Sequence, residues 1–137
     1  MRFMMLVKSA KHSGPPPKEL MEAIAKLGEE ASRAGNMVET GGLAPAAMST
    51  RVRLTQGKIT AIDGPFAETR ELVGGYAIFE FKSKQEAIES TLHFMELHRK
   101  YWPGWEGETE IRQIFTQEDY TCEPGSLALK PNGLHGS

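Results

Sequence analysis

The residues best suited to acid–base chemistry in this chain of 137 residues are two carboxylates and a histidine. Asp63 and Glu71 flank a short charged loop, and His98 lies near the end of a long helical pattern. The intrinsic pKa of histidine lies near neutrality, so a histidine beside a carboxylate can act as a general base. We therefore predict a catalytic set of Asp63, His98 and Glu71.

The two histidines of the helical pattern are expected to differ. At about 100° per residue, Ile88, Leu92 and Met95 belong to one apolar arc, and His98 falls inside it. His93 falls on the opposite, solvated side, so the two histidines cannot chelate one metal. We expect His98 to point inward at a carbonyl-rich helix end, which can favour its charged form. A packed histidine bonded to a backbone carbonyl is the competing interpretation, and the sequence alone favours it.

Asp63 also has two interpretations. An aspartate before Gly-Pro commonly forms a turn in which its side chain accepts backbone N–H groups. Alternatively, the turn places Asp63 at the mouth of a pocket. The pair Gly74-Gly75, which follows Glu71 closely, permits a bulge or the close approach of a ligand to the backbone.

Five residues are candidates for binding a substrate. Arg51, Arg53 and Arg70 could hold a carboxylate. Tyr76 and Trp102 could contact an apolar group. Such arginines are more often exposed strand or loop residues than substrate ligands. A tryptophan in an aromatic cluster more often serves packing than substrate binding.

The spacing of possible ligands predicts no metal site. Asp63, Glu71 and a histidine would have to converge, and nothing in their spacing encodes that. A metal-binding dimer that uses His98 with Asp63 is a third, weaker hypothesis. Phosphate-binding Gly-Lys loops, nucleophile elbows and dinucleotide fingerprints are absent from the sequence. We expect no cofactor.

Length and composition restrict the class of protein. The length fits one domain, and a formal net charge of −2 argues against a nucleic-acid partner. Cys122 is the only cysteine, which excludes an intrachain disulfide and favours a cytoplasmic protein. The first apolar run is too short for a signal peptide, and no window approaches the ~20 apolar residues of a membrane helix.

The hydrophobic pattern predicts an alternation of strands and helices. Gly35-Asn36 is a helix stop, Gln56-Gly57 a two-residue hairpin turn, and Ser83 with Glu86 has the spacing of a capping box. Glycines and a proline at 41–45 predict a break. The expected elements are strands at 3–7, 37–40, 51–55, 58–62, 76–81 and 108–115, and helices at 18–34 and from 84 to about 101.

This order predicts an α+β, ferredoxin-like βαββαβ sandwich with an inserted β-hairpin over residues 1–115, followed by a tail over 116–137. Both helices would cover one face of the sheet. Strands 3–7 and 76–81 are apolar on both sides, so Met, Tyr and Phe side chains would lie on the open face. Pairing of two such faces in a homodimer is the favoured solution; the alternative is a monomer whose tail covers the sheet. We expect the tail to be mobile or packed on the partner subunit.

One sequence motif is more specific than a connecting loop requires. Asp63-Gly64-Pro65-Phe66 is followed by Glu71-Leu72-Val73-Gly74-Gly75-Tyr76, and an opening strand Arg2-Phe3-Met4-Met5-Leu6 precedes both. From Met1 to about Phe115 the chain resembles the DGPF, or YCII-related, domain family. The resemblance implies a dimeric α+β barrel in which two ferredoxin-like protomers pack sheet against sheet.

The resemblance also bears on activity. Proteins of the wider superfamily include cofactor-free oxygenases, small-lactone isomerases and ligand-sensing domains. The resemblance implies a pocket with a His and Asp pair for the YCII-related group, and Asp63 matches a landmark acid of the family. We expect a cytoplasmic homodimer that binds a small-molecule ligand and acts on it by acid–base chemistry. A non-catalytic ligand-binding or regulatory dimer is the alternative.

Overall fold

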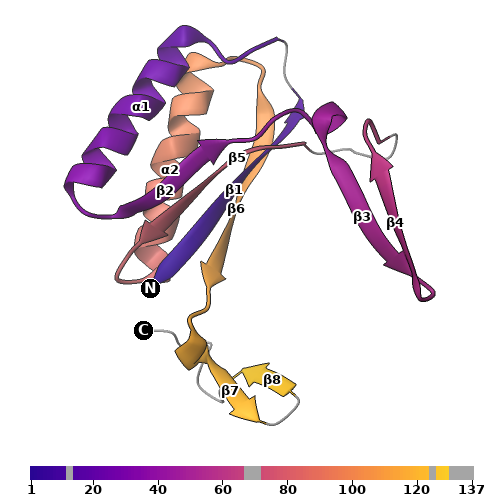
Figure 1. The fold of residues 1–137 in the computed structure, drawn as a ribbon. Helices are drawn as coiled ribbons and strands as arrows, with labels where there is room; N and C mark the ends of the chain where they lie inside the picture. Colours follow the sequence, from indigo (N-terminus) through magenta and orange to yellow (C-terminus); the bar gives the residue numbers. More distant parts are fainter. Residues whose placement is uncertain (12–13, 67–71, 124–125, 130–137) are drawn as a thin grey trace.

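The computed structural model describes residues 1–11, 14–66, 72–123 and 126–129 (Figure 1). The helices are α1 (Lys18–Arg33) and α2 (Lys84–Tyr101), with 3-10 turns η1 (Ala46–Met48) and η2 (Gln117–Asp119). The strands are β1 (Arg2–Lys11), β2 (Met37–Gly42), β3 (Thr50–Thr55), β4 (Lys58–Asp63), β5 (Leu72–Glu80), β6 (Glu106–Ile114), β7 (Tyr120–Glu123) and β8 (Ser126–Leu129).

The body of the fold is an antiparallel sheet in the order β2-β5-β1-β6. Both helices cover one face of this sheet (Figure 1). The arrangement is α+β and compatible with a ferredoxin-like fold. Strands β3 and β4 form a second sheet, and β7 and β8 form a third within the segment predicted as a tail.

Local signals in the sequence specify the helix ends. Gly35 has a φ of 78°, its N–H donates to the Ser32 carbonyl, and the N–H of Asn36 donates to that of Ala31. This pattern is a Schellman motif and confirms the predicted helix stop. The Ser83 hydroxyl accepts from the backbone N–H of Glu86 at 3.2 Å, which confirms the predicted cap.

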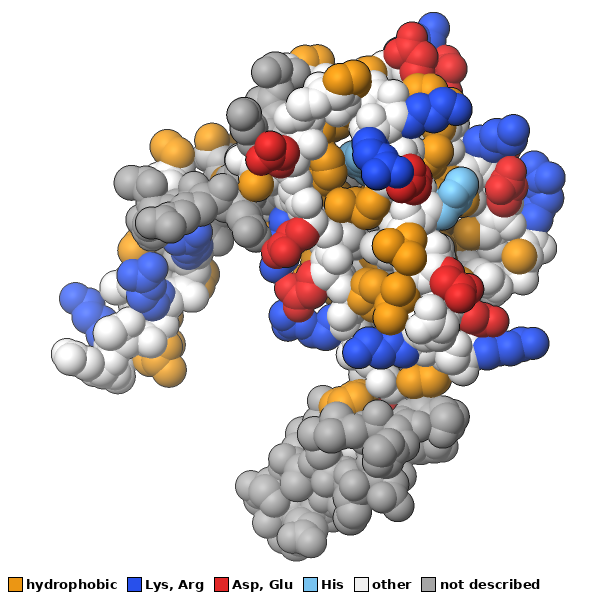
Figure 2. Space-filling view, turned by 180° about the vertical axis from the view of Figure 1, so that it is seen from behind, with side chains coloured by type: hydrophobic (Ala, Val, Ile, Leu, Met, Phe, Trp, Pro, Cys, Tyr) orange, Lys and Arg blue, Asp and Glu red, His pale blue; other side chains and the backbone are white. Residues whose placement is uncertain are grey.

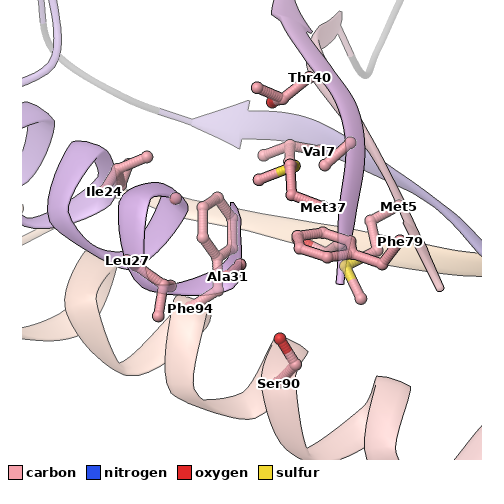
Figure 3. Close-up of a pocket in the computed structure, with 13 residues that line it drawn as sticks. Met5, Val7, Ile24, Leu27, Ala31, Met37, Thr40, Phe79, Ser90 and Phe94 are labelled. Atoms are coloured by element: carbon pink, nitrogen blue, oxygen red, sulfur yellow. The ribbon is translucent and has the colours of Figure 1, made fainter. Parts of the chain in front are cut away.

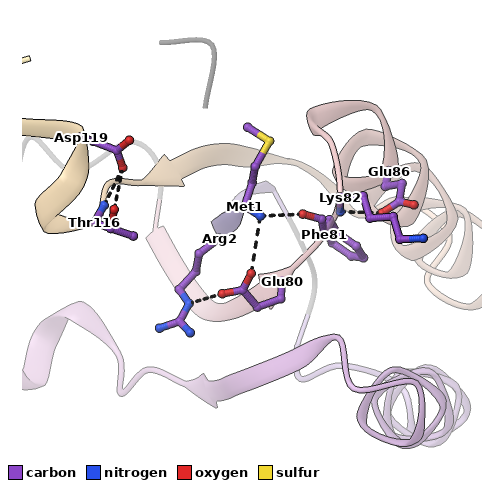
Figure 4. Close-up of polar contacts among 8 residues, drawn as sticks. All are labelled: Met1, Arg2, Glu80, Phe81, Lys82, Glu86, Thr116 and Asp119. Atoms are coloured by element: carbon purple, nitrogen blue, oxygen red, sulfur yellow. Dashed lines mark hydrogen bonds and ion pairs between the residues drawn. The ribbon is translucent and has the colours of Figure 1, made fainter. Parts of the chain in front are cut away.

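The predicted capping box differs from the observed one in one partner. The Glu86 carboxylate accepts from the N–H of Lys82, one residue before the cap (Figure 4). The chain's first residues lie at the same end of the sheet. The amino group of Met1 donates to the Phe81 carbonyl at 2.8 Å, and Arg2 donates to Glu80 at 2.8 Å, which lowers the pKa of Glu80 (Figure 4).

The predicted break at 41–45 begins later than expected. Gly41 and Gly42 still belong to β2, because they pair with Tyr76 and Gly75 of β5. The register then shifts between Val7 and Lys8 of β1, so Gly74 is the extra residue of a bulge. Of the two uses predicted for the glycine pair, a bulge or the close approach of a ligand, the structure has the bulge. It lets the Gly74 carbonyl accept the N–H of Leu43 at 3.0 Å.

The core lies between the sheet and the helices. Phe3 and Phe79 are buried beneath Ala87 of α2, and Phe81 packs against them. The prediction that phenylalanines lie on the open face is therefore wrong for both β1 and β5. Each strand is apolar on both sides, so only the register decides which side chains meet the helices. Strand alternation gives the open face Met4, Leu6, Tyr76 and Ile78 instead.

Strands β3 and β4 form a hairpin arm, defined here as residues 50–63, that projects from the body (Figures 1 and 2). Its turn residues Gln56 and Gly57 have φ values of 51° and 77°, as a two-residue primed turn requires. The predicted two-residue turn at Gln56-Gly57 is thus confirmed. The arm's two strands pack chiefly on each other.

The hairpin arm has two different faces. Val52 and Leu54 pair with Ala61 and Ile59, so these four apolar residues share one face. Cationic side chains occupy the other face, which consists of Arg51, Arg53, Thr55, Lys58, Thr60 and Ile62. Val52, Leu54 and Ile59 are 71%, 69% and 70% exposed, so the apolar face has no cover within the described chain.

Candidate functional site

His98 lies in an aromatic cluster at the end of α2. Its ring centroid is 4.7 Å from that of Phe94 and 4.5 Å from that of Trp105. Only 5% of the residue is exposed, whereas His93 is exposed. The inward position predicted for His98 and the outward position predicted for His93 are both confirmed.

The hydrogen bonding of His98 fixes its tautomer. Its Nδ1 lies 3.0 Å from the carbonyl oxygen of Phe94. A carbonyl can only accept, so Nδ1 carries the proton and Nε2 carries the lone pair. No hydrogen bond in the described chain uses Nε2, yet no side-chain nitrogen there is both fully buried and unpartnered. Nε2 therefore retains contact with solvent.

The burial of His98 determines its charge. Burial lowers the pKa of His98 below its ordinary value of 6.5, and the hydrogen bond to Phe94 opposes this only in part. The expectation that the helix end favours a charged His98 is therefore wrong. The ring lies among aromatic side chains, and the cost of removing an imidazolium from water exceeds the effect of the carbonyls. At neutral pH His98 is an uncharged base.

A tight turn brings Trp105 back onto His98. Trp102 ends α2, and Gly104 has a φ of 89° in a turn in which the N–H of Trp105 donates to the Trp102 carbonyl at 3.1 Å. Proline at 103 and glycine at 104 are the residues that a type II turn favours. The rings of Trp102 and Trp105 then stack at 6.1 Å. The substrate-binding candidate Trp102 therefore belongs to the His98 cluster.

Strand residues hold the other side of Trp105. The indole N–H donates to the Ser9 hydroxyl at 3.2 Å. At Gly107 a Cβ would lie 2.3 Å from the Lys8 carbonyl oxygen and 2.5 Å from the Trp105 ring. Only glycine leaves room there for the indole. Sequence reasoning missed Ser9 and Gly107, although a glycine two residues after a tryptophan was a usable signal.

A partly enclosed cavity of about 90 Å³ lies between the helices and the sheet (Figure 3). Phe94 borders this cavity and also contacts His98, so the cavity and the cluster share a wall. The cavity was not predicted. Thirteen residues line it: Met5, Val7, Ile24, Leu27, Gly28, Ala31, Met37, Thr40, Ala77, Phe79, Ser90, Phe94 and Thr109.

Asp63 lies elsewhere, at the foot of the hairpin arm. Its carboxylate accepts from the Thr50 hydroxyl at 2.7 Å, across the β3–β4 pair. The N–H of Gly64 donates to the Ser49 carbonyl at 2.8 Å, and a Cβ at Gly64 would lie 2.4 Å from the Ala46 carbonyl oxygen. The Asp-Gly-Pro-Phe motif thus closes the arm against η1. In the described chain no hydrogen bond joins Asp63 to His98.

The remaining predicted residues occupy three places. The guanidinium of Arg51 lies 3.7 Å from the centroid of the Phe66 ring, and Arg53 is exposed farther along the arm. Arg70 and Glu71 lie outside the described residues. Tyr76 lies on the open sheet face, away from the helices.

The Tyr76 hydroxyl donates to the Glu39 carboxylate, and this hydrogen bond raises the pKa of Tyr76. A Cβ at Gly41 would lie 3.1 Å from the Tyr76 ring, so the glycine lets the ring lie across β2. On the same face of the sheet, Glu110 accepts from Lys8 at 2.7 Å and also pairs with Arg112, and the two cations together lower the pKa of Glu110. The open face therefore mixes apolar residues with paired charges.

The structure does not gather the predicted catalytic and binding residues at one place. His98 and Trp102 share a cluster, the hairpin arm holds Asp63, Arg51 and Arg53, and the open face holds Tyr76. Within the described ranges, no three His, Cys, Asp or Glu side chains lie close enough to hold a metal ion. Nor is any helix there long and apolar enough to cross a membrane.

Comparison with known proteins gives one finding for part of the chain. A sequence model of the YCII-related domain matches residues 1–93. The matched segment includes the sheet strands β1, β2 and β5, the hairpin arm and most of α2. It ends before His98 and Trp105. A search of curated proteins finds no similar sequence.

Proposed function

The chain belongs to the YCII-related domain family, and from that premise we propose that it is a homodimeric, enzyme-like protein that acts on a small metabolite. His98 serves as the general base. Its substrate is a small, partly apolar molecule with a carbonyl group. The matched segment ends before His98, so this role is argued from the geometry of the site alone.

One observation supports this function above the others: His98 is an uncharged base with one available nitrogen. Nδ1 is occupied by the Phe94 carbonyl, and Nε2 has a lone pair and solvent contact. Burial keeps the pKa of His98 low enough that the base form predominates at neutral pH. A general base needs an unprotonated nitrogen within reach of its substrate.

Proton removal from a carbon next to a carbonyl fits this arrangement. The C–H bond breaks, its proton passes to Nε2, and its electron pair moves into the carbonyl group to form an enolate. His98 becomes an imidazolium and returns the proton to the substrate when the product forms. The Phe94 and Trp105 rings hold the imidazole in one orientation.

Dimerisation is supported by two uncovered apolar surfaces. The open sheet face carries Met4, Leu6 and Ile78, and the hairpin arm carries an exposed apolar face. A two-stranded ribbon is marginally stable in water without packing against another element. A second copy, placed sheet against sheet as in a dimeric α+β barrel, would cover both. In that fold the arm is an inserted hairpin.

The single cysteine supports a cytoplasmic location.

The test is a ligand screen followed by turnover. Melting temperature is measured with a panel of small organic acids, lactones and quinones. A ligand at 100 times its Kd adds about 2.7 kcal/mol of stability, which is readily visible. We expect at least one compound to stabilise the protein and to exchange its acidic proton with D₂O. His98→Gln should abolish exchange while binding persists. Exchange that survives in His98→Gln would overturn the role of His98.

A non-catalytic ligand-binding or regulatory dimer is the second candidate. The observation in its favour is that the Asp-Gly-Pro-Phe motif has a sufficient structural role at the foot of the arm. Catalytic roles for Asp63 and Glu71 remain predictions. A ligand that stabilises the protein and is recovered unchanged, with no deuterium exchange, would favour this candidate.

A further inference from the structure

The apolar stripe of α1 is incompletely packed. Leu20, Ile24, Leu27 and Ala31 recur at helical spacing, but only Leu20 is buried and the other three are half-buried. The cavity of about 90 Å³ lies beneath the under-packed part, between α1, α2 and the sheet. Protein interiors rarely leave a space this large between packed elements. The space therefore needs an explanation beyond packing.

The lining restricts the chemistry of a ligand. No charged side chain borders the cavity, and its walls are aliphatic, aromatic and methionine side chains with three hydroxyls. A charged molecule would lose its hydration there without compensation. Met5 of β1 and Met37 of β2 have unbranched side chains that adapt to the shape of an apolar ligand. A neutral, mainly apolar ligand is the class that fits.

Ser90 supplies a polar contact. Figure 3 shows its hydroxyl pointing up from α2 toward the cavity. The Thr40 hydroxyl donates to the Tyr76 carbonyl at 3.0 Å, and that of Thr109 to the sulfur of Met95 at 3.2 Å. In the described chain Ser90 has no such partner. Its hydroxyl can donate to, or accept from, one polar atom of a ligand.

We propose that this cavity binds a neutral molecule about the size of a benzene ring, with one oxygen atom hydrogen-bonded to the Ser90 hydroxyl. At about 90 Å³ the cavity is smaller than an engineered apolar cavity of about 150 Å³ that accommodates benzene, so the flexible side chains of Met5 and Met37 must shift for a single ring to enter. Phe94 separates the cavity from the His98 ring by one side chain. The cavity ligand would be the apolar part of the substrate on which His98 acts, and to that extent the proposal rests on the proposed function.

Phenol and benzene are the probes, and methionine methyl groups are the reporters. Protein labelled with ¹³C at the methionine methyls is titrated with each probe and followed by NMR. Met5 and Met37 border the cavity, whereas Met21 and Met48 are 51% and 75% exposed on other surfaces. We expect saturable shifts at Met5 and Met37 and none at Met21 and Met48. Benzoate, which has a similar size but a charge, should not bind.

Two variants reduce the volume of the cavity, and one control does not. Ala31→Leu places three more carbons in it and should weaken phenol at least tenfold. Gly28→Ala adds one methyl, whose only near neighbour is the methyl carbon of Met37 at 3.8 Å, and it favours the helix, so it serves if Ala31→Leu does not fold. Ala25→Leu, on the exposed face of α1, should leave binding unchanged.

Ser90→Ala tests the polar contact. A neutral hydrogen bond contributes a few-fold in affinity, so phenol should bind about fivefold more weakly while benzene is unaffected. The proposal is overturned if neither probe shifts Met5 and Met37, or if Gly28→Ala and Ala31→Leu bind phenol as the wild type does. His98→Gln should retain phenol binding. A failure of the cavity proposal, seen as absent phenol binding, can therefore be told apart from a failure of the proposed function, seen as proton exchange that does not depend on His98.

Discussion

The body of the protein and its hairpin arm use the same strand chemistry with opposite results. In the body, Phe3 and Phe79 are 1% and 9% exposed because two helices cover their face of the sheet. In the arm, Val52 and Leu54 alternate with arginines just as regularly, yet they are 71% and 69% exposed. An alternating pattern therefore specifies a strand with one apolar face, and a second element must supply the cover. For the body that element is in the same chain, and for the arm we propose that it is a second copy.

The largest difference between the regions should be seen on truncating a core residue. Phe3→Ala should lower the free energy of unfolding by about 3–5 kcal/mol, because it leaves a cavity beneath the helices. Met48→Ala, at a residue that is 75% exposed in η1, should change it by less than about 0.5 kcal/mol. Urea denaturation measures both. Equal losses would mean that the body is not the stabilising core.

Charging the apolar face of the arm should affect association instead. Leu54→Asp places a carboxylate among Val52, Ile59 and Ala61, and it should weaken dimerisation by about 30-fold or more, as loss of an interface hot spot does. Thr60→Asp, on the cationic face, is the matched control. Sedimentation equilibrium gives both dissociation constants. Identical constants for Leu54→Asp and the wild type would exclude the arm from the interface.

A smaller effect should follow from closing the space beside Trp105. Gly107→Ala adds a methyl group that overlaps the Lys8 carbonyl and the indole of Trp105. The backbone or the ring must shift to make room, which should lower the free energy of unfolding by about 1–3 kcal/mol. The shifted indole should also change its fluorescence spectrum. Gly74→Ala is a suitable control, because a Cβ there meets nothing within 4 Å. Unchanged fluorescence and stability in Gly107→Ala would contradict the packing described.

Acid should produce the smallest change in stability. Burial lowers the pKa of His98 in the folded state, so the unfolded chain binds more protons as the pH falls below about 6.5. The stability linked to His98 is full above that pH and declines as the pH falls toward the folded pKa. His98→Gln should remove this decline below pH 6.5. A wild type and variant with parallel profiles would show that His98 titrates normally.

Sequence patterns predicted the local elements because local chemistry determines them. The Gly35-Asn36 stop, the Gln56-Gly57 turn and the Ser83 cap each depend on residues only a few positions apart. The inward position of His98 followed from helical spacing in the same way. The family resemblance was also sound, since a YCII-related sequence model matches residues 1–93.

Contacts between distant segments could not be read from the pattern. Thr50 meets Asp63 only through the β3–β4 register, and Ser9 meets Trp105 across 96 positions. The side of the sheet on which Phe79 lies depends on pairing with Phe3, because its strand is apolar on both faces. The cavity depends on how closely α1 approaches the sheet, which no residue spacing encodes. The charge of His98 was misjudged because Trp105, whose ring packs against the imidazole, lies beyond the helix.

The most direct test of the account is the protonation state of His98. Proton–nitrogen correlation NMR on ¹⁵N-histidine protein, assigned with His98→Gln, reports the tautomer and the pKa. We predict a neutral ring at pH 7 with its proton on Nδ1, its lone pair on Nε2, and a pKa below 6.5. A ring that is protonated at pH 7, or one with its proton on Nε2, would contradict the role of His98 as the base.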